Sequence, residues 1–278
     1  MSYPTNLIRS YTAATRPTAA SVPAGTMILI SDYGINGSVW RSNGSVWIPV
    51  DSNIRMQGLT VGVILPSLVA ANLATYSQVG TTITVDNTLA HNIPATTFDG
   101  NSVYLTPSSG TLVEGIFTNF TRTGANTFTC ESSISQTISG NLASTTGIKT
   151  LGTLTLPANL LGATGYFEND CTWQFLNSSN NKTITFQFGG GNYYNVSNTV
   201  NLTTRILIGM RNKNATNVQQ SNCTNTASGT SSTSSALFVT SIDTTANVAI
   251  DIRGTAAAAN EYICVENCSF NVWPSTLV

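Results

Sequence analysis

The sequence predicts an all-β protein, and three observations support this class. Hydrophobic residues make up 41% of the 278 residues while charged residues make up only 8%, so Thr, Ser and Asn have to build the surface. Thr suits a pleated sheet, and Asn and Gly supply turns. Several segments also alternate apolar and polar residues with the period of a strand.

We expect four parts along the chain. Residues 1–50 form a small N-terminal β-hairpin docking unit with an extended arm, because residues 1–20 carry spaced Pro, Thr and Ala with little periodicity. Residues 51–79 form a linker with a short helix. Residues 80–145 form a small middle β domain, and residues 146–278 form a C-terminal, jelly-roll-like β-sandwich.

The stretch GSVWRSNGSVW at 37–47 predicts a hairpin. Asn43-Gly44 is the dipeptide that a two-residue type I′ turn favours, and this turn places Trp40 directly opposite Trp47. We interpret the pair as packing inside a docking unit or a subunit interface. A carbohydrate platform would use the same residues, so this alternative stays open.

The linker holds the one good helix candidate of the chain. LPSLVAANLATYSQ has helical spacing at Leu65, Leu68, Val69 and Leu73, and Pro66 is tolerated in a first turn. The longest apolar run, residues 58–74, is broken by Pro66 and Asn72 and is too short to span a membrane. We therefore expect no membrane partner.

The remaining strands follow from period-two patterns and turns. In the middle domain a hairpin is expected around Thr123 to Asn126. In the C-terminal part the polar tract 221–235 predicts a long loop or a ragged edge strand. The expected C-terminal strands lie near 149–156, 165–176, 182–188, 199–210, 236–242, 246–253 and 260–273.

Charge and cysteine content limit the partners and the chemistry. The net charge is −1 and no basic stripe marks a nucleic-acid groove. The start MSYPTNLIRS shows no apolar core followed by a small-residue cleavage site, so we expect no secretory signal and synthesis in a cytoplasm. The five cysteines are odd in number and widely spaced, so we expect buried free thiols and no disulfide framework.

No catalytic, cofactor or metal residue is expected. His91 is the single histidine, so a site with several histidines cannot form. A triad would have to use His91, and no nucleophile elbow accompanies it, so we do not expect a triad. A glycosidase needs two facing carboxylates, and only Glu168 and Asp170 share a strand face at close spacing. We interpret the local pairs as solvated or turn carboxylates: Glu168 with Asp170, Asp243 with Asp251, and Glu261 with Glu266.

One loop offers a candidate for binding. Gly189-Gly190-Gly191 lacks the Lys and helix start of a phosphate loop and predicts a turn. The neighbouring Tyr193 and Tyr194 could then lie at an exposed loop tip and contact a glycan. Packing inside the protein is the competing interpretation.

Three stretches resemble virion proteins of tailed bacteriophages. The segment RPTAASVPAGTMILISDYGINGSVWRSNGSVWIPV resembles the N-terminal module of their fibre, spike and minor structural proteins. HNIPATTFDGNSVYLTPSSGTLVEGIFTNFTRTGANTFTCESSISQTISGNL is similar to a β module that recurs in them, and the chain beyond TLTLPANLLG is similar to their C-terminal sandwich domains. The resemblance implies a trimer whose N-terminal unit docks on the virion. It departs from the family in having no long repeats or shaft.

These observations together predict a non-enzymatic structural protein of a phage particle, such as a tail fibre, a head fibre, a collar or a capsid decoration. Its partners would be its own copies in a homotrimer and other virion proteins of the capsid, the portal or neck, or the tail. The first alternative is a receptor-binding protein for a host surface glycan. An enzyme that cleaves surface polysaccharide is the less favoured alternative.

Overall fold

The computed structural model describes residues 8–33, 37–50, 53–56, 62–68, 74–143, 147–200, 202–225 and 239–275. Within these ranges the regular structure consists of β-strands and one short 3₁₀ turn, η1 (Ala19–Ser21). The predicted all-β class is confirmed. The jelly-roll arrangement of the sandwich stays a prediction.

The N-terminal part forms a small sheet of its own with the order β1-β2-β3-β4. Its strands are β1 (Arg9–Tyr11), β2 (Met27–Ile30), β3 (Ser38–Ser42) and β4 (Trp47–Pro49). β1 runs parallel to β2, while the other pairs are antiparallel. Part of the expected N-terminal arm therefore belongs to this sheet.

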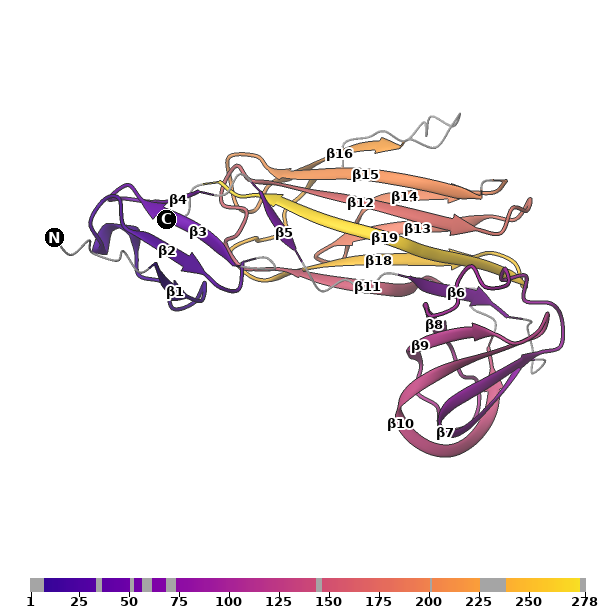
Figure 1. Cartoon of the computed structure of the whole chain (residues 1–278). Helices are drawn as coiled ribbons and strands as arrows, with labels where there is room; N and C mark the ends of the chain where they lie inside the picture. The colour runs from indigo at the N-terminus through magenta and orange to yellow at the C-terminus, as the bar shows by residue number, and fades with distance from the viewer. Residues whose placement is uncertain are drawn as a thin grey trace.

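Two sheets face each other in the C-terminal part and form a sandwich (Figure 1). The first sheet runs β17 (Val239–Thr240), β16 (Gln219–Asn225), β15 (Thr203–Asn212), β12 (Tyr166–Phe175) and β19 (Glu261–Trp273), and β5 (Ile54–Met56) pairs with the end of β19. The second sheet runs β11 (Lys149–Leu156), β18 (Val248–Ala256), β13 (Lys182–Phe188) and β14 (Gly191–Asn198).

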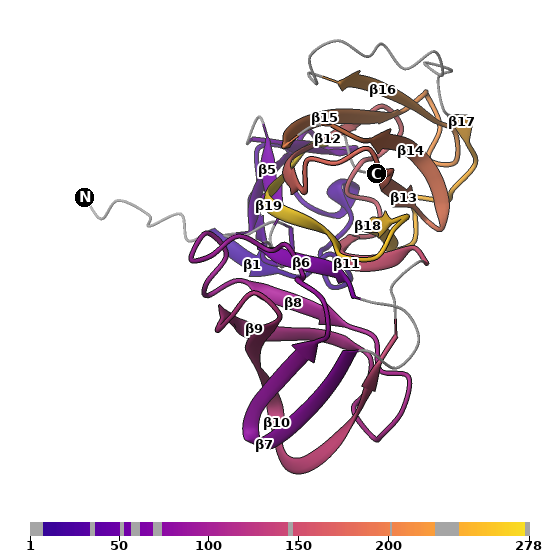
Figure 2. The same cartoon turned by 90° about the vertical axis from the view of Figure 1, so that its right-hand side faces the viewer.

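The first sheet continues into the middle part of the chain. β6 (Val63–Ser67) pairs with β19 on one side and with β8 (Ser102–Leu105) on the other. Beyond β8 follow β9 (Gly115–Arg122), β10 (Thr127–Leu142) and β7 (Ala74–Asn87). Figure 2 shows these last strands curling into a small separate unit below the sandwich, and a bridge between Pro107 and Leu142 ties the end of β10 to the segment after β8.

The helix predicted in the linker is wrong. Residues 63–67 form β6 and residues 74–78 begin β7, while 69–73 lie outside the described residues. Every residue of β6 is buried because both faces of the strand are covered: Val63 and Leu65 pack in the core of the sandwich, and Ile64 packs in the core of the middle unit. A fully buried strand shows no alternation, so its apolar run cannot be distinguished from a helix by spacing alone.

Two cores hold the molecule together. The first joins the N-terminal sheet to the sandwich, with Trp40 and Trp47 in the same cluster as Trp173 and Phe186, and Tyr33 Oη donates to the Ala158 carbonyl at 3.1 Å. The second fills the middle unit and takes in residues from β6 and β19, such as Tyr262 and Cys264. The middle unit thus packs on the outer side of the first sheet.

Candidate functional site

The N-terminal hairpin differs from the prediction in its turn and its register. Asn43 Oδ1 accepts hydrogen bonds from the backbone N–H groups of Ser45 and Val46, each at 2.9 Å, and Gly44 has a φ of +92°. The Asn43 side chain thereby stabilises a longer loop, 43–46, in place of the two-residue turn. Trp47 consequently pairs with Ser42, and Trp40 with Pro49, so the predicted opposition of the two tryptophans is wrong.

Both tryptophans are core residues of the chain. Each is 0% exposed. Trp47 Nε1 donates to the Pro17 carbonyl at 2.9 Å, and Trp40 packs edge-on against Tyr33 with ring centroids 6.0 Å apart. Neither ring can serve as a carbohydrate platform, which leaves packing. Docking of this unit on another protein stays a prediction.

Tyr193 and Tyr194 do not lie at an exposed loop tip, so that prediction is wrong. The turn is confirmed, since Gly189 and Gly190 have positive φ between β13 and β14, but the tyrosines follow it inside β14. Tyr193 is 4% exposed and packs against Phe167 and Phe186. Tyr194 packs on Phe186 with ring centroids 5.9 Å apart. Tyr193 belongs to the sandwich core, and Tyr194 lies partly buried against it, so the structure does not present the pair to a glycan at a loop tip.

His91 is a buried structural residue. It is 1% exposed and packs edge-on against Phe128, with ring centroids 5.6 Å apart. Its Nδ1 accepts a hydrogen bond from the backbone N–H of Ile93 at 3.1 Å, so the imidazole is held in one neutral tautomer. Burial lowers the pKa of His91.

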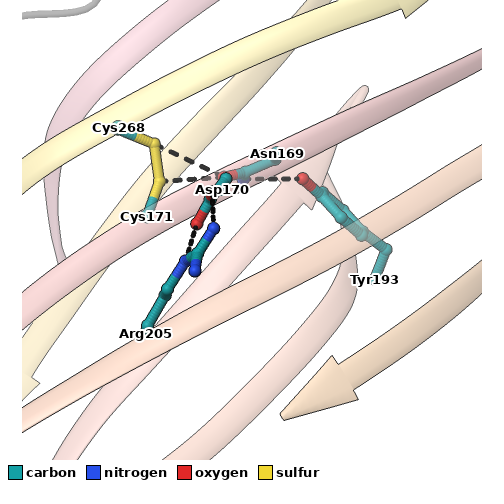
Figure 3. The surroundings of a disulfide bond; sticks show 6 residues. All are labelled: Asn169, Asp170, Cys171, Tyr193, Arg205 and Cys268. Atoms are coloured by element: carbon teal, nitrogen blue, oxygen red, sulfur yellow. Dashed lines mark hydrogen bonds and ion pairs between the residues drawn. A yellow bond between two sulfur atoms is a disulfide. The ribbon is translucent and has the colours of Figure 1, made fainter. Parts of the chain in front are cut away.

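One pair of cysteines forms a disulfide, which corrects the prediction of free thiols for these two. Cys171 on β12 and Cys268 on β19 lie directly opposite each other, with Cα atoms 4.1 Å apart, and are bonded. Their sequence separation of 97 hides this proximity in the sequence. Figure 3 shows the Asn169 side chain between the two sulfurs and the Tyr193 hydroxyl. Cys130 and Cys264 are free and buried as predicted.

Glu261 is also not the solvated carboxylate that we predicted. It forms a buried ion pair with Lys182, at 3.1 Å, and the Lys182 and Glu261 side chains are 0% and 3% exposed. Ser178 and Asn180 donate to the other carboxylate oxygen at 2.6 and 2.9 Å, and Lys182 Nζ also donates to Ser178 Oγ at 2.7 Å. This closed network links β13, β19 and the loop before β13, and it leaves the Ser178 hydroxyl engaged on both sides.

The middle unit covers only part of the outer side of the first sheet. On the uncovered part, aromatic and polar side chains of β12, β15 and β19 lie next to one another. Odd-numbered residues of β12 lie in the core, so the even-numbered ones point outward. In the neighbouring strands Arg211 and Trp273 lie opposite Tyr166, and Asn271 lies opposite Glu168. We name this surface the open face; it consists of Tyr166, Glu168, Asp170, Arg211, Asn271 and Trp273.

The Tyr166 ring lies over the bare backbone of Gly209. A Cβ atom at position 209 would overlap the ring and the hydroxyl of Tyr166, so only glycine allows this placement. Trp273 packs against the ring with centroids 5.2 Å apart, and the Arg211 guanidinium lies 6.0 Å from the Tyr166 centroid. The Tyr166 hydroxyl donates to Glu168 Oε2 at 3.0 Å. Burial and this hydrogen bond raise the pKa of Tyr166 to about 12, so the hydroxyl stays a donor at neutral pH.

The two carboxylates of the open face share one side of β12, as predicted. Asp170 accepts two hydrogen bonds from Arg205, at 2.8 and 2.5 Å (Figure 3), in the bidentate geometry that fixes a guanidinium. Glu168 accepts from Tyr166. The sequence signal that we missed was the isolated Gly209 in the strand RILIGMR, because a glycine inside a strand often marks a close approach.

The middle unit carries a concave surface. A groove of about 510 Å³ is lined by residues of β7 and β10, mostly small and polar, together with Tyr76 and Asp86. The Tyr76 hydroxyl donates to the Ser109 carbonyl at 3.2 Å and accepts from the Leu112 N–H at 3.2 Å. It is therefore engaged within the protein.

The part of the chain that the structure describes holds neither a metal-binding cluster nor a membrane-spanning helix. No three His, Cys, Asp or Glu side chains there gather into a group that could hold a metal ion. Among the same residues no helix is long and apolar enough to cross a membrane.

Comparison with known proteins adds little. No family model matches the chain, and no curated protein matches it. Among solved structures, a mutant of the GH43 protein BlXynB from Bacillus licheniformis is similar to this chain with 6% identity and a TM-score of 0.15. The match covers 86% of this chain and 62% of that protein. A similarity of this size supports no conclusion about fold or activity.

Proposed function

We propose that the chain is a non-enzymatic structural component of a tailed-phage particle, anchored through residues 1–50 and displaying its C-terminal β domain. It is a homotrimer in this proposal, and its neighbours are other virion proteins. The resemblance of the sequence to virion proteins of tailed phages suggests the kind of particle to which the chain would belong. One physical observation supports assembly: the surface combines few charges with exposed apolar side chains.

These apolar side chains are large and widely distributed. The most exposed ones include Val113 at 76%, Val79 at 71%, Val200 at 65%, Leu202 at 61% and Ile134 at 60%. Only 8% of the residues carry a charge, which gives little electrostatic repulsion between molecules. Contacts with identical or neighbouring subunits would remove such side chains from water.

The arrangement of the parts is compatible with anchoring at one end. The N-terminal sheet lies at one end of the sandwich, and the middle unit lies near the opposite end (Figure 1). A contact made by the N-terminal sheet would leave the outer side of the sandwich and the middle unit free. Tail fibre, head fibre, collar and capsid decoration all remain positions that this layout would serve.

Two measurements test the proposal. Light scattering coupled to size-exclusion chromatography of the full chain should give the mass of a trimer, and a stable, well-folded monomer would count against assembly. Gold-labelled antibodies against residues 146–278 should decorate intact particles. Antibodies that find the protein only in the infected-cell extract, and never on particles, would rule out a virion role.

A further inference from the structure

We infer that the open face binds a carbohydrate, with a pyranose ring stacked on Tyr166 and Trp273 and its hydroxyls held by Glu168 and Asn271. The inference rests on the side chains of this face. The choice of bacterial surface glycans as its ligands rests on the proposed function.

The aromatic pair supplies the stacking surface. A pyranose has a flat side of C–H groups and a rim of hydroxyls, and aromatic rings at binding surfaces bury such apolar area while their polar ends stay wet. Tyr166 is held down over Gly209, which removes the freedom that an exposed tyrosine would otherwise lose on binding. Trp273, with its ring centroid 5.2 Å from that of Tyr166, extends the surface across β19.

Polar groups flank the aromatic pair where the sugar hydroxyls would lie. Glu168 uses one oxygen for the Tyr166 hydroxyl, and a carboxylate has roughly four acceptor sites, so it can accept further hydrogen bonds. Asn271 lies directly opposite Glu168 and offers both a donor and an acceptor. Arg211 adds guanidinium donors beside the Tyr166 ring.

The carboxylates of the open face make it a poor surface for a protein partner. Aromatic residues and arginine are common in protein interfaces, but Asp and Glu are depleted there, and Glu168 and Asp170 lie close together here, beside Arg205. Arg211 and Arg55, which lies opposite Asn271, form no ion pair with any residue that the structure describes. Covering these groups with protein would cost desolvation energy, whereas a polyhydroxylated ligand replaces the water around them.

Tryptophan fluorescence gives a direct readout. Of the four tryptophans, Trp40, Trp47 and Trp173 are each 0% exposed, while Trp273 is partly exposed. Acrylamide should therefore quench Trp273 selectively, and a bound sugar should protect it. The probes are purified O-antigens, capsular polysaccharides, teichoic acids and peptidoglycan fragments on an array, followed by titration of the soluble full-length protein with each positive one.

Three variants locate the site. Tyr166→Ala should weaken binding at least about tenfold, as loss of a central aromatic contact does. Gly209→Ala keeps every binding group but forces the Tyr166 ring off the backbone, and it should give a comparable loss. The matched control is Tyr104→Ala, because Tyr104 also donates to a glutamate, Glu114 at 3.0 Å, and lies under a cation, Lys149 at 6.0 Å; it should bind like the natural protein.

The outcomes separate the possibilities. Protection of Trp273 that disappears in both open-face variants supports the inference. Binding that survives in Tyr166→Ala, or the absence of binding to every probe, overturns it. If Tyr166→Ala instead changes the mass of the assembly in light scattering, the face is a subunit interface and the inference is also overturned. Circular dichroism checks folding. Should Gly209→Ala fail to fold, Asn271→Ala is the second variant, because it leaves Trp273 in place as the reporter and should also weaken the protection.

Discussion

The inner side of β19 packs in the sandwich core along both halves of the strand. Its outer side is covered in the first half and open in the second. In both halves the inward side chains, such as Ile263 and Val272, lie in the first core. On the outer side Tyr262 and Cys264 are buried in the second core under the middle unit. Asn271 and Trp273, further along, form part of the open face. One strand thus passes from being covered on both sides to being covered on one.

The change occurs at a β-bulge. Thr172 pairs with Asn267 and Trp173 pairs with Val265, so Glu266 is the extra residue between them. A bulge bends and twists the strand, and here it lies between the part of the sheet that carries the middle unit and the part that does not. The outward-facing residues of a strand, more than its inward-facing ones, therefore indicate whether a second layer covers the sheet.

Glu261→Ala should have the largest effect on the free energy of unfolding, because it removes the buried ion pair with Lys182 at the covered end of β19. The change leaves Lys182 as a buried charge without its carboxylate, which costs about 3–5 kcal/mol. Urea denaturation followed by circular dichroism measures the loss. The double variant Lys182→Met with Glu261→Met is the control and should recover most of the stability, since apolar replacement of a buried ion pair is often neutral or stabilising. A single variant as stable as the natural protein would contradict the buried pair.

Tyr262→Ala tests the covered half of the strand against the open half. Removing this fully packed ring, which lies edge-on to Phe98 with centroids 5.5 Å apart, should cost about 3 kcal/mol through lost burial and a cavity. Trp273→Ala on the open half should cost only about 1 kcal/mol, because surface positions tolerate change better. Thermal denaturation of the two variants side by side gives the difference. Equal losses would mean that both halves are covered.

The Cys171–Cys268 disulfide joins β12 to β19 on the inner side of the sheet, and its removal tests how much it stabilises the fold. Replacing Cys171 and Cys268 together by Ser should lower stability by about 2–4 kcal/mol, since the bond closes a long loop of the unfolded chain. Mass spectrometry of unreduced peptides should find the two residues linked. A reducing agent should lower the unfolding midpoint of the natural protein and leave that of the double variant unchanged. Equal sensitivity in both proteins would contradict the bond.

Much of the fold could be predicted from local patterns. The alternation in KTITFQF and ANVAIDIR predicted β13 and β18, and the turn near Thr123 predicted the β9–β10 hairpin. The errors arose where long-range contacts decide the outcome. Leu65 belongs to a strand because β19 and β8 lie on either side of β6, and Cys171 meets Cys268 only because β12 pairs with β19.

The candidate site was the least predictable part. Tyr193 and Tyr194 follow a glycine turn, which suggested exposure, but their strand packs against the first sheet, so that Tyr193 is buried and Tyr194 is partly buried. Tyr166 and Trp273 lie on strands that are far apart in the sequence, and only sheet pairing brings them together. The Glu168 and Asp170 spacing was visible, since residues two positions apart on a strand share a face. The sequence did not show that Tyr166 and Trp273 would lie together beside these carboxylates.

Replacing Glu266, at the bulge between the two halves of β19, should change stability the least but should show the clearest pH dependence. Burial raises the pKa of Glu266, and its Oε1 is buried without a hydrogen-bond partner among the described residues. The folded state therefore keeps a proton at pH values where the unfolded chain, with a pKa of about 4.3, has lost it. The contribution of this group to stability is fully present below the unfolded pKa and is lost as the pH rises through the raised pKa of the folded state.

Glu266→Gln should remove this decline, so that the variant is more stable than the natural protein at neutral pH and the difference shrinks in acid. Unfolding midpoints between about pH 4 and pH 7 measure it. Asp243→Asn is the contrasting control: hydrogen bonds from Thr245 lower the pKa of Asp243, so its contribution is present at neutral pH and is lost as the pH falls. If both variants shift the pH profile in the same direction, the Glu266 carboxylate is not buried at the bulge, and the boundary between the covered and open halves of β19 lies elsewhere.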